Sequence, residues 1–254
     1  MEIRAHFLPQ LISPGELAGG VSVVIDVLRA TTTITAALAA GAGEVIPCLE
    51  VEDARRTAAN LPAGQAVLGG ERGGVKIEGF DLGNSPCDFT AATVGGKSVV
   101  FTTTNGTRAM LHAREADEVW LAAIVNLSAV VSRCQERARI DLVCAGTGGR
   151  ITREDVLLAG AIAARLTASA SGASQAVAVL NDQAALARAA WLQAVAELGS
   201  EPLPVRLRRE LRATQGGRNL AKLNLEADLA DAAAVDRYSI VPRFDVRLGR
   251  ITAV

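Results

Sequence analysis

Residues 23 to 40 read Val-Val-Ile-Asp-Val-Leu-Arg-Ala-Thr-Thr-Thr-Ile-Thr-Ala-Ala-Leu-Ala-Ala, an apolar run followed by an Ala-rich segment. The β-branched run predicts a buried strand, and the threonines after it open a helix. Such a junction gathers free backbone N–H groups and the positive end of a helix dipole, which suit an anion. It also carries Asp26, a hard oxygen ligand for a divalent cation, and Arg29. These features predict a metal-assisted phosphate site; the alternative is that Asp26 is a satisfied strand-end group and that the threonines only cap the helix.

The composition of the chain bounds its class and its location. The chain has 254 residues, of which 50% are hydrophobic and 3% aromatic, so we expect an aliphatic core in one large α/β domain or two lobes. The formal net charge of −1 argues against a nucleic-acid partner. No apolar run reaches the roughly 18 residues of a membrane span, and the N-terminus lacks an apolar signal core. We therefore expect no membrane association and a cytoplasmic location.

The cysteines and histidines form no recognisable metal or catalytic motif. The 4 cysteines include no CxxC pair, and the 2 histidines are His6 and His112. A zinc site of thiolates and imidazoles is therefore disfavoured, and a Ser-His-Asp or Cys-His pair would need one of these histidines. Any metal must then rely on carboxylates, which indicates Mg²⁺, Mn²⁺ or Ca²⁺.

Strands and helices alternate along the first two thirds of the chain, at spacings that imply a layered α/β/α fold. We expect a largely parallel or mixed sheet with helices on both faces and with the polar turns gathered at its carboxyl edge. Residues 1–170 form the expected core, which carries most of the site. Residues 171–254 form a mainly helical portion packed on the same core. The expected strands are Val21–Leu28, Glu44–Leu49, Ser98–Thr102, Glu118–Ala122 and Ile140–Cys144, with weaker signals at Val177–Leu180 and Tyr238–Val241 and a linker at Ser171–Ser174.

A Gly-rich segment early in the chain adds further polar side chains. In Gly69–Gly74, glycines flank Glu71 and Arg72, so the backbone can approach a small ligand closely. The carboxylate could hold a metal and the guanidinium an oxyanion. Asn84 and Ser85 follow, just before another expected helix. A surface loop with an ordinary ion pair and a helix cap would explain the same residues.

Three later segments have similar chemistry. Residues 102–108 combine hydroxyls, an Asn-Gly turn and an arginine, but lack the lysine of a P-loop at the required spacing. Residues 146–149 read Gly-Thr-Gly-Gly before a helix that opens with Glu154 and Asp155, a placement that the helix dipole alone also favours. That segment does not follow the GxGxxG pattern of an NAD site. Residues 214–220 contain a Gly-Gly-Arg that adds an anion contact or presents a solvated charge.

These segments, in this order, resemble the 2-phosphosulfolactate phosphatase family. The similar stretches are VVIDVLRATTTI at 23–34, GERGG at 70–74, GFDLGNSP at 79–86, TTNGTRAM at 103–110, CAGTGG at 144–149, EDVLLAGAI at 154–162, GGRNL at 216–220 and the end from Asp236 through Val241-Pro242. The resemblance implies a magnesium-dependent phosphatase that converts 2-phospho-3-sulfolactate to 3-sulfolactate, a step towards coenzyme M in organisms that make it. Such a ligand carries phosphate, sulfonate and carboxylate groups, which agrees with several arginines around a small site.

The resemblance assigns roles to residues of this chain. Asp26, Arg29 and Glu71 are the expected catalytic residues, and Mg²⁺ is the expected cofactor. Asp26 is the first choice of metal ligand, with Glu71, Glu154 or Asp155 completing the set. Water attack is preferred over an aspartyl-phosphate on Asp26, because the Asp-x-Asp pair of haloacid-dehalogenase-type phosphatases is absent and position 28 is Leu. The expected substrate-binding residues are Thr31, Thr32, Thr33, Arg72, Asn84, Ser85, Thr104, Asn105, Gly106, Thr107, Arg108, Gly146, Thr147, Gly217, Arg218 and Asn219.

Two other functions remain open from the sequence. A phosphatase of the same fold could act on another small phosphorylated acid. A non-catalytic protein could keep the anion pocket without hydrolysis. The expected partner in each case is a small anionic ligand, and the Ala-rich helical surface at 184–198 permits a homodimer.

Overall fold

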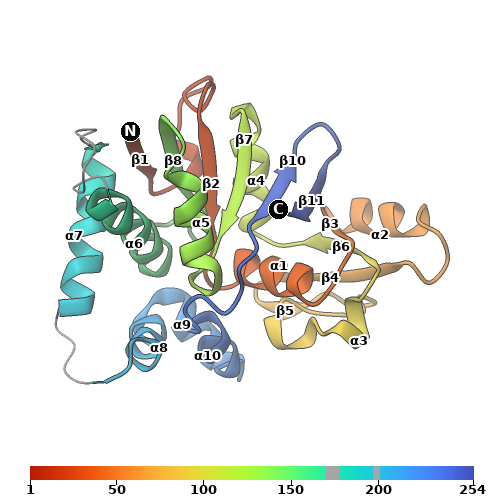
Figure 1. Cartoon of the computed structure of the whole chain (residues 1–254). Coiled ribbons are helices and arrows are strands. Elements are labelled where there is room, and N and C mark those ends of the chain that lie inside the picture. Colours follow the sequence, from red (N-terminus) through yellow and green to blue (C-terminus); the bar gives the residue numbers. More distant parts are fainter. Residues whose placement is uncertain (170–177, 197–200) are drawn as a thin grey trace.

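The computed structural model describes residues 1–169, 178–196 and 201–254. Its strands form one mixed sheet in the order β5-β4-β6-β3-β11-β10-β7-β2-β8-β1-β9 (Figure 1). The strands are β1 (Glu2–His6), β2 (Val21–Ile25), β3 (Glu44–Pro47), β4 (Ala66–Arg72), β5 (Val75–Lys76), β6 (Ser98–Thr102), β7 (Glu118–Ala122), β8 (Arg139–Cys144), β9 (Val179–Leu180), β10 (Pro242–Asp245) and β11 (Arg250–Ala253). The α/β class is confirmed.

Two parallel sets of strands are joined by the C-terminal hairpin. One set is β4, β6 and β3, and the other is β7, β2, β8, β1 and β9. Strand β10 pairs antiparallel with β7, and β11 pairs antiparallel with β3. Because β10 and β11 are also antiparallel to each other, the two sets run in opposite senses through the sheet. In Figure 1 the strands of one set run steeply across those of the other.

Helices cover both faces of the sheet. Along β2, Val23 and Ile25 pack into one apolar cluster with α5 and α6, and Val24 packs into the other cluster with α1 and α4. This alternation is the two-residue period of a strand that is buried on both faces. The helices are α1 (Ala30–Ala39), α2 (Val51–Ala59), α3 (Ala91–Val94), α4 (Gly106–His112), α5 (Leu127–Cys134), α6 (Arg153–Ser169), α7 (Asp182–Ala196), α8 (Leu203–Ala213), α9 (Gln215–Lys222) and α10 (Ala227–Ala232).

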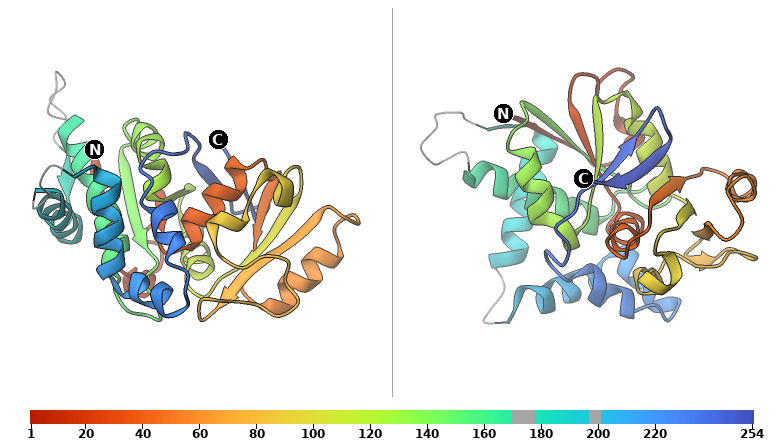
Figure 2. Two further views of the ribbon diagram at one scale, coloured as in Figure 1. Left: turned by 90° about the horizontal axis from the view of Figure 1, so that it is seen from below. Right: turned by 45° about the vertical axis from the view of Figure 1, so that its right-hand side comes forward.

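The C-terminal helices sit at one end of the central strands. Figures 1 and 2 both show α8, α9 and α10 (blue) gathered beyond one end of β2 and β7. Helix α7 packs along α6, on the outer side of β1. Among the described helices, none combines the length and the apolar character that crossing a bilayer requires.

Several predicted boundaries need correction. The strands at Ser98–Thr102 and Glu118–Ala122 have the predicted bounds, but β2 ends at Ile25 rather than Leu28 because the chain turns there into α1. The strand predicted at Tyr238–Val241 is wrong: the observed strand, β10, follows it directly and begins at Pro242. The linker predicted at Ser171–Ser174 lies outside the described residues.

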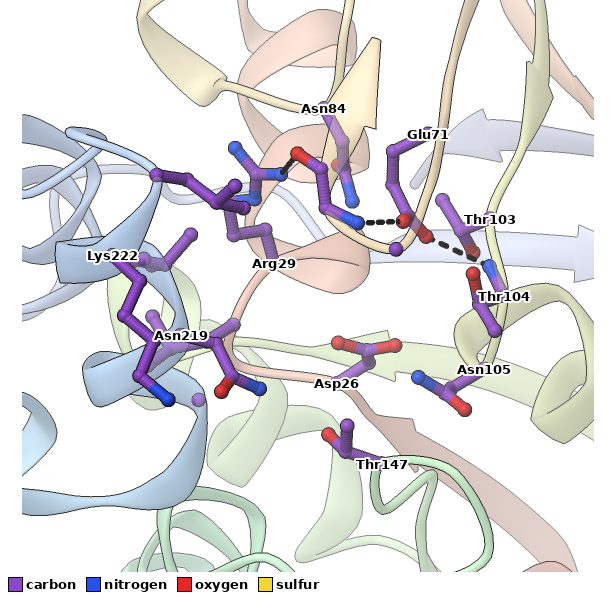
Figure 3. Close-up of a pocket in the computed structure, with 16 residues that line it drawn as sticks. Asp26, Arg29, Glu71, Asn84, Thr103, Thr104, Asn105, Thr147, Asn219 and Lys222 are labelled. Carbon is purple, nitrogen blue, oxygen red and sulfur yellow. Dashed lines mark hydrogen bonds between the residues drawn. The ribbon is translucent and has the colours of Figure 1, made fainter. Parts of the chain in front are cut away.

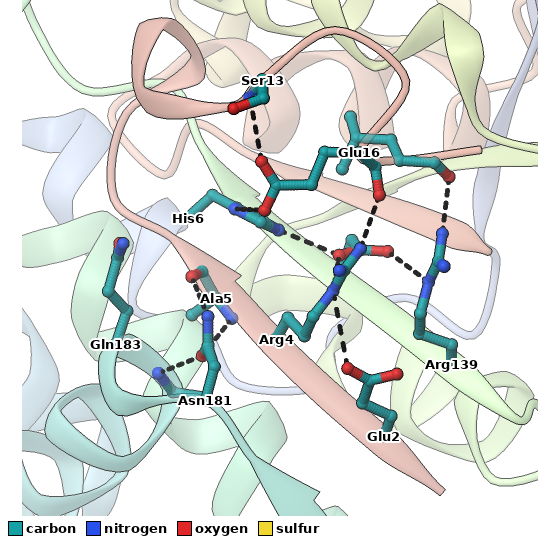
Figure 4. A network of polar contacts seen from close by, with 12 residues as sticks. Glu2, Arg4, Ala5, His6, Ser13, Glu16, Arg139, Asn181 and Gln183 are labelled. Atoms are coloured by element: carbon teal, nitrogen blue, oxygen red, sulfur yellow. Dashed lines mark hydrogen bonds and ion pairs between the residues drawn. The ribbon is translucent and has the colours of Figure 1, made fainter. Parts of the chain in front are cut away.

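A buried polar network ties β1 to β8 (Figure 4). His6 Nε2 lies 2.9 Å from Asp141 Oδ1, and Arg4 Nε donates to the same oxygen at 2.7 Å. Arg139 Nε donates to the second carboxylate oxygen at 3.1 Å. Burial opposes ionisation of Asp141, but hydrogen bonds from His6 and Arg4 outweigh it and lower the pKa of this carboxyl. His6 therefore has a structural partner within the sheet.

Candidate active site

One pocket of about 320 Å³ opens where strands of both parallel sets end (Figure 3). Asp26 follows β2, Glu71 lies near the end of β4, Thr103 follows β6, and Thr147 lies in the turn after β8. Helix α9 forms another side of the pocket. Carboxyl ends of strands are where α/β sheets usually bind ligands, and here residues at the ends of strands from both sets line one pocket.

Asp26 sits in a tight turn between β2 and α1. The Thr31 N–H and hydroxyl donate to the Asp26 carbonyl at 3.0 and 2.9 Å, which closes the turn. The side-chain Oδ1 accepts the Ala30 N–H at 3.2 Å. Burial raises the pKa of Asp26 to about 7. The hydrogen bond from Ala30 opposes this rise, and repulsion from Glu71 and Glu154 adds to it. A cation bound in the pocket would therefore stabilise the charged form of Asp26.

Arg29 is buried at the same turn and is held from two sides. Its Nη1 donates to Asp228 Oδ2 at 2.7 Å, and its Nη2 donates to the Gly74 carbonyl at 2.9 Å. Asp228 comes from α10, and its other oxygen accepts the Ser85 hydroxyl at 2.5 Å. Sequence reasoning missed Asp228, because nothing in a short helix distinguishes a buried aspartate from a solvated one.

Glu71 joins two loops of the pocket. Its Oε2 accepts the Gly74 N–H at 2.6 Å, and its Oε1 accepts the Thr104 N–H at 2.8 Å (Figure 3). The side chain is buried and lines the pocket. Each carboxylate oxygen keeps further acceptor capacity, so Glu71 can meet a ligand while it positions both loops.

Glu154 and Asp155, at the start of α6, lie behind the pocket wall. Asp155 Oδ1 accepts the Val27 N–H at 2.9 Å, and Oδ2 accepts the Gly146 N–H at 3.0 Å. Asp155 therefore ties the turns after β2 and β8 together, and burial with repulsion from nearby carboxylates raises its pKa well above the ordinary value. Burial also raises the pKa of Glu154, which packs so closely against Gly216 that a Cβ there would lie 2.1 Å from its Oε1.

The predicted threonines shape the turn rather than the pocket wall. Thr31, Thr32 and Thr33 are buried, and their hydroxyls donate to the backbone carbonyls of Asp26, Val27 and Asn84. None of the three lines the pocket. The turn needs Thr31 and Thr32 as donors because its carbonyl groups have left the sheet ladder and are buried away from water. Thr33 instead ties α1 to the loop that carries Asn84.

The four arginines predicted as site residues, Arg29, Arg72, Arg108 and Arg218, do not all reach the pocket. Of the described arginines, only Arg29 lines the pocket. Arg72 donates to the carbonyls of Glu71 and Leu49 and to the Thr102 hydroxyl. Arg218 donates to the nearby Ala213 carbonyl, and Arg108 is exposed and faces a separate hollow beside α4. Lys222, on α9, is the other cationic residue of the pocket wall, and it makes no ion pair within the described part of the chain. No sequence pattern marks a single lysine at the end of a helix as a ligand.

The remaining predicted residues divide between the wall and its support. Asn84, Thr104, Asn105, Thr147 and Asn219 line the pocket. Gly106 stands behind Asp26, where a Cβ would lie 2.8 Å from Oδ2. Ser85, Thr107, Gly146 and Gly217 do not line the pocket. They donate hydrogen bonds to the side chains of Asp228, Thr103, Asp155 and Thr214, respectively, and so support the surrounding loops and helices. The wall also contains Leu28, Gly73, Gly74, Thr103, Gly216 and Leu220, which lie in the predicted segments but were given no role, and Lys222 and Leu223, which the sequence did not single out.

Buried polar atoms without partners point to a polar ligand. Among the described residues, Asn84 Oδ1, Thr104 Oγ1 and Glu154 Oε2 are buried and accept or donate no hydrogen bond. Unpaired buried polar atoms are costly, so such atoms around one pocket indicate a missing partner.

The four carboxylates predicted as metal ligands do not form one cluster. In the ranges that the structure describes, no three His, Cys, Asp or Glu side chains are arranged around a common metal position. Magnesium, however, usually binds through one or two carboxylates together with water and a substrate phosphate. Asp26, with Glu71 or Glu154 nearby, fits a site of that kind, because only one oxygen of Asp26 accepts a hydrogen bond within the described chain.

The sequence is similar to proteins of one named family. The family model described as 2-phosphosulpholactate phosphatase matches residues 6–246. The chain is 41% identical over 231 residues to a protein of Symbiobacterium thermophilum named probable 2-phosphosulfolactate phosphatase, covering 90% of this chain and 93% of that protein. Proteins with the same name from Parasynechococcus marenigrum and Pseudothermotoga lettingae are 40% and 37% identical, covering 90% and 95% of this chain and the same shares of their own lengths.

Proposed function

Because the chain belongs to the 2-phosphosulfolactate phosphatase family, and so to the phosphoric monoester hydrolases, we propose that it hydrolyses 2-phospho-3-sulfolactate to 3-sulfolactate and phosphate with magnesium as cofactor. The substrate comes from the names of the relatives. The observation that carries the proposal is the buried Asp26 carboxylate, which shares one pocket with Arg29 and Lys222. For the cell, the proposal includes a cytoplasmic enzyme on a route towards coenzyme M, in organisms that make that compound.

The pocket provides separate contacts for separate anionic groups. We assign the phosphate to the end where Arg29 and Asp26 lie, because the guanidinium keeps N–H donors that are not used by Asp228 or Gly74. We assign the sulfonate or carboxylate group to Lys222 and the amide of Asn219 on α9. A pocket of about 320 Å³ is at the small end for ligand sites, which suits a three-carbon substrate.

Asp26, with Glu71 or Glu154, would hold the magnesium ion. When bound, the ion supplies positive charge that polarises the phosphate and offsets the charge that develops during hydrolysis. Asp26 is suited to this role because its pKa of about 7 reflects a buried carboxylate without enough compensating charge. A nearby carboxylate that is not needed for the metal can accept the proton of the attacking water.

Water attack remains the preferred mechanism. An aspartyl-phosphate route of the Asp-x-Asp type needs a second acid two residues after the nucleophile. Leu28 occupies that position, and its side chain, which lines the pocket, has no ionisable group. Asp26 therefore acts in this proposal by holding charge in place rather than by bonding to phosphorus.

Phosphate release from a panel of acids tests the proposal. The panel contains 2-phospho-3-sulfolactate, phospholactate and phosphoglycerate, each with Mg²⁺. We expect the highest kcat/KM for the sulfonated acid, because only that substrate places a sulfonate beside Lys222. Equal or higher kcat/KM for the other acids would change the substrate, and no release from any of them would favour a binding protein.

A further inference from the structure

Asp228 connects the C-terminal helices to the pocket through a buried ion pair. Its side chain is almost fully buried, and its Oδ2 accepts a hydrogen bond from Arg29 Nη1 at 2.7 Å. The two residues lie 199 positions apart in the sequence. Its second oxygen accepts the Ser85 hydroxyl at 2.5 Å. Both acceptor atoms are therefore directed at residues beside the pocket, and the carboxylate is held in one orientation.

This contact determines how Arg29 presents its donors. A guanidinium has five N–H groups in a rigid plane. One N–H group on Nη1 donates to Asp228 and one on Nη2 donates to the Gly74 carbonyl, so both terminal nitrogens are held by protein groups. The Arg29 side chain is only 4% exposed, so water cannot replace either partner easily. The unused N–H groups are then left for the pocket that Arg29 lines.

We propose that Asp228 is a positioning residue for the phosphatase reaction: it holds the Arg29 guanidinium at the angle at which its free N–H groups meet the substrate phosphate. This inference rests on the proposed function. It also gives α10 a role, since α10 does not itself line the pocket but supplies the partner that fixes Arg29. Arg29 needs Asp228 for this, because a buried guanidinium without its counter-ion is energetically costly.

A double-mutant cycle tests the proposal. Asp228→Asn removes the charge and keeps the shape, and we expect kcat to fall by about tenfold or more while KM changes by less than about threefold. In an Arg29→Lys background the same substitution should change kcat by less than about threefold, because the guanidinium that it positions is gone. Equal losses of kcat in both backgrounds would overturn the proposal.

Asp141→Asn is the matched control for a merely structural effect. Asp141 is also buried and paired with arginine, but it belongs to the network between β1 and β8 and does not line the pocket. We expect both variants to unfold at lower urea concentration, while only Asp228→Asn lowers kcat. Unchanged kcat in folded Asp228→Asn protein would contradict the assignment.

Two further variants keep the test decisive. Asp228→Glu retains the charge and should regain part of the lost kcat. If Asp228→Asn does not fold, Ser85→Ala carries the test. It removes the hydroxyl donor from one oxygen of Asp228, leaves only the longer contact from the Cys87 thiol there, and should lower kcat by about threefold. Unchanged kcat there would also overturn the proposal. Calorimetry with inorganic phosphate separates the two claims. If the wild type binds phosphate but hydrolyses no sulfolactate ester, the function fails, while weaker phosphate binding by Asp228→Asn than by Asp141→Asn still supports the positioning role.

Discussion

Replacing Asp26 with Asn should stabilise the protein while it removes activity. The carboxylate is buried, and it is repelled by Glu71 and Glu154. Asn keeps the shape, and its oxygen can still accept the Ala30 N–H that now reaches Asp26 Oδ1 at 3.2 Å. The substitution therefore removes an unfavourable buried charge without opening a cavity.

The size and the pH range of the effect follow from the pKa of Asp26. Its pKa is about 7 in the folded protein against an ordinary value of 3.8. A carboxyl with a raised pKa keeps its proton in the folded state after the unfolded chain has released it, so its contribution is complete below about pH 4 and is lost as pH rises towards 7. At 1.36 kcal/mol per pKa unit, the loss above pH 7 is about 4 kcal/mol. We expect Asp26→Asn to recover about 2 to 4 kcal/mol at pH 8 and close to nothing at pH 4.

Urea unfolding followed by circular dichroism, in EDTA at pH 4, 6 and 8, measures this difference. Asp141→Asn is the control with the opposite sign, because hydrogen bonds lower the pKa of Asp141 and its loss should destabilise the protein most at high pH. Saturating Mg²⁺ should shrink the advantage of Asp26→Asn, since only the wild type gains from binding the ion. An Asp26→Asn protein that is no more stable than wild type at pH 8 in EDTA would refute the reasoning.

Two substitutions test the pocket, one in its wall and one behind Asp26. Lys222→Met should raise KM by about tenfold and change kcat by less than about twofold, because it removes a contact to the second anionic group; Lys97→Met, outside the pocket, should change neither constant. Gly106→Ala should lower kcat by about tenfold or more, because its Cβ would lie 2.8 Å from Asp26 Oδ2. Gly160→Ala is the control, since its Cβ would lie 2.0 Å from a backbone oxygen of α7. It should lower the free energy of unfolding by about 2 kcal/mol and leave kcat unchanged. Steady-state kinetics and urea unfolding of the purified variants distinguish these outcomes.

The fold was predictable where a strand is buried on both faces. Such strands appear as continuous apolar runs, and Ser98–Thr102 and Glu118–Ala122 were placed at their observed bounds. The strand β1 escaped notice because Arg4 and His6 interrupt its apolar pattern to meet Asp141 of the neighbouring strand. The C-terminal hairpin was missed for another reason. Each of its strands has only 4 residues, and their partners β7 and β3 lie far away in sequence.

The site was predictable in its loops but not in its charge balance. A carboxylate at the end of a buried strand led to Asp26, and a carboxylate among glycines led to Glu71; both line the pocket. Asp228 could not be found in this way. Helix α10 carries it beside Asp231, and only the docking of that helix decides which of the two aspartates is buried against Arg29. The exposure of an arginine likewise depends on its neighbours, as the local contacts of Arg218 show.

Phosphate release from 2-phospho-3-sulfolactate by the wild type, with Mg²⁺ and then with excess EDTA, tests the central claim most directly. Asp26→Asn and Asp141→Asn are assayed beside it. The account predicts fast release that needs Mg²⁺, no measurable release from Asp26→Asn, and a wild-type rate per folded molecule for Asp141→Asn. Release that continues in EDTA, or that survives the loss of the Asp26 carboxylate, would contradict the account.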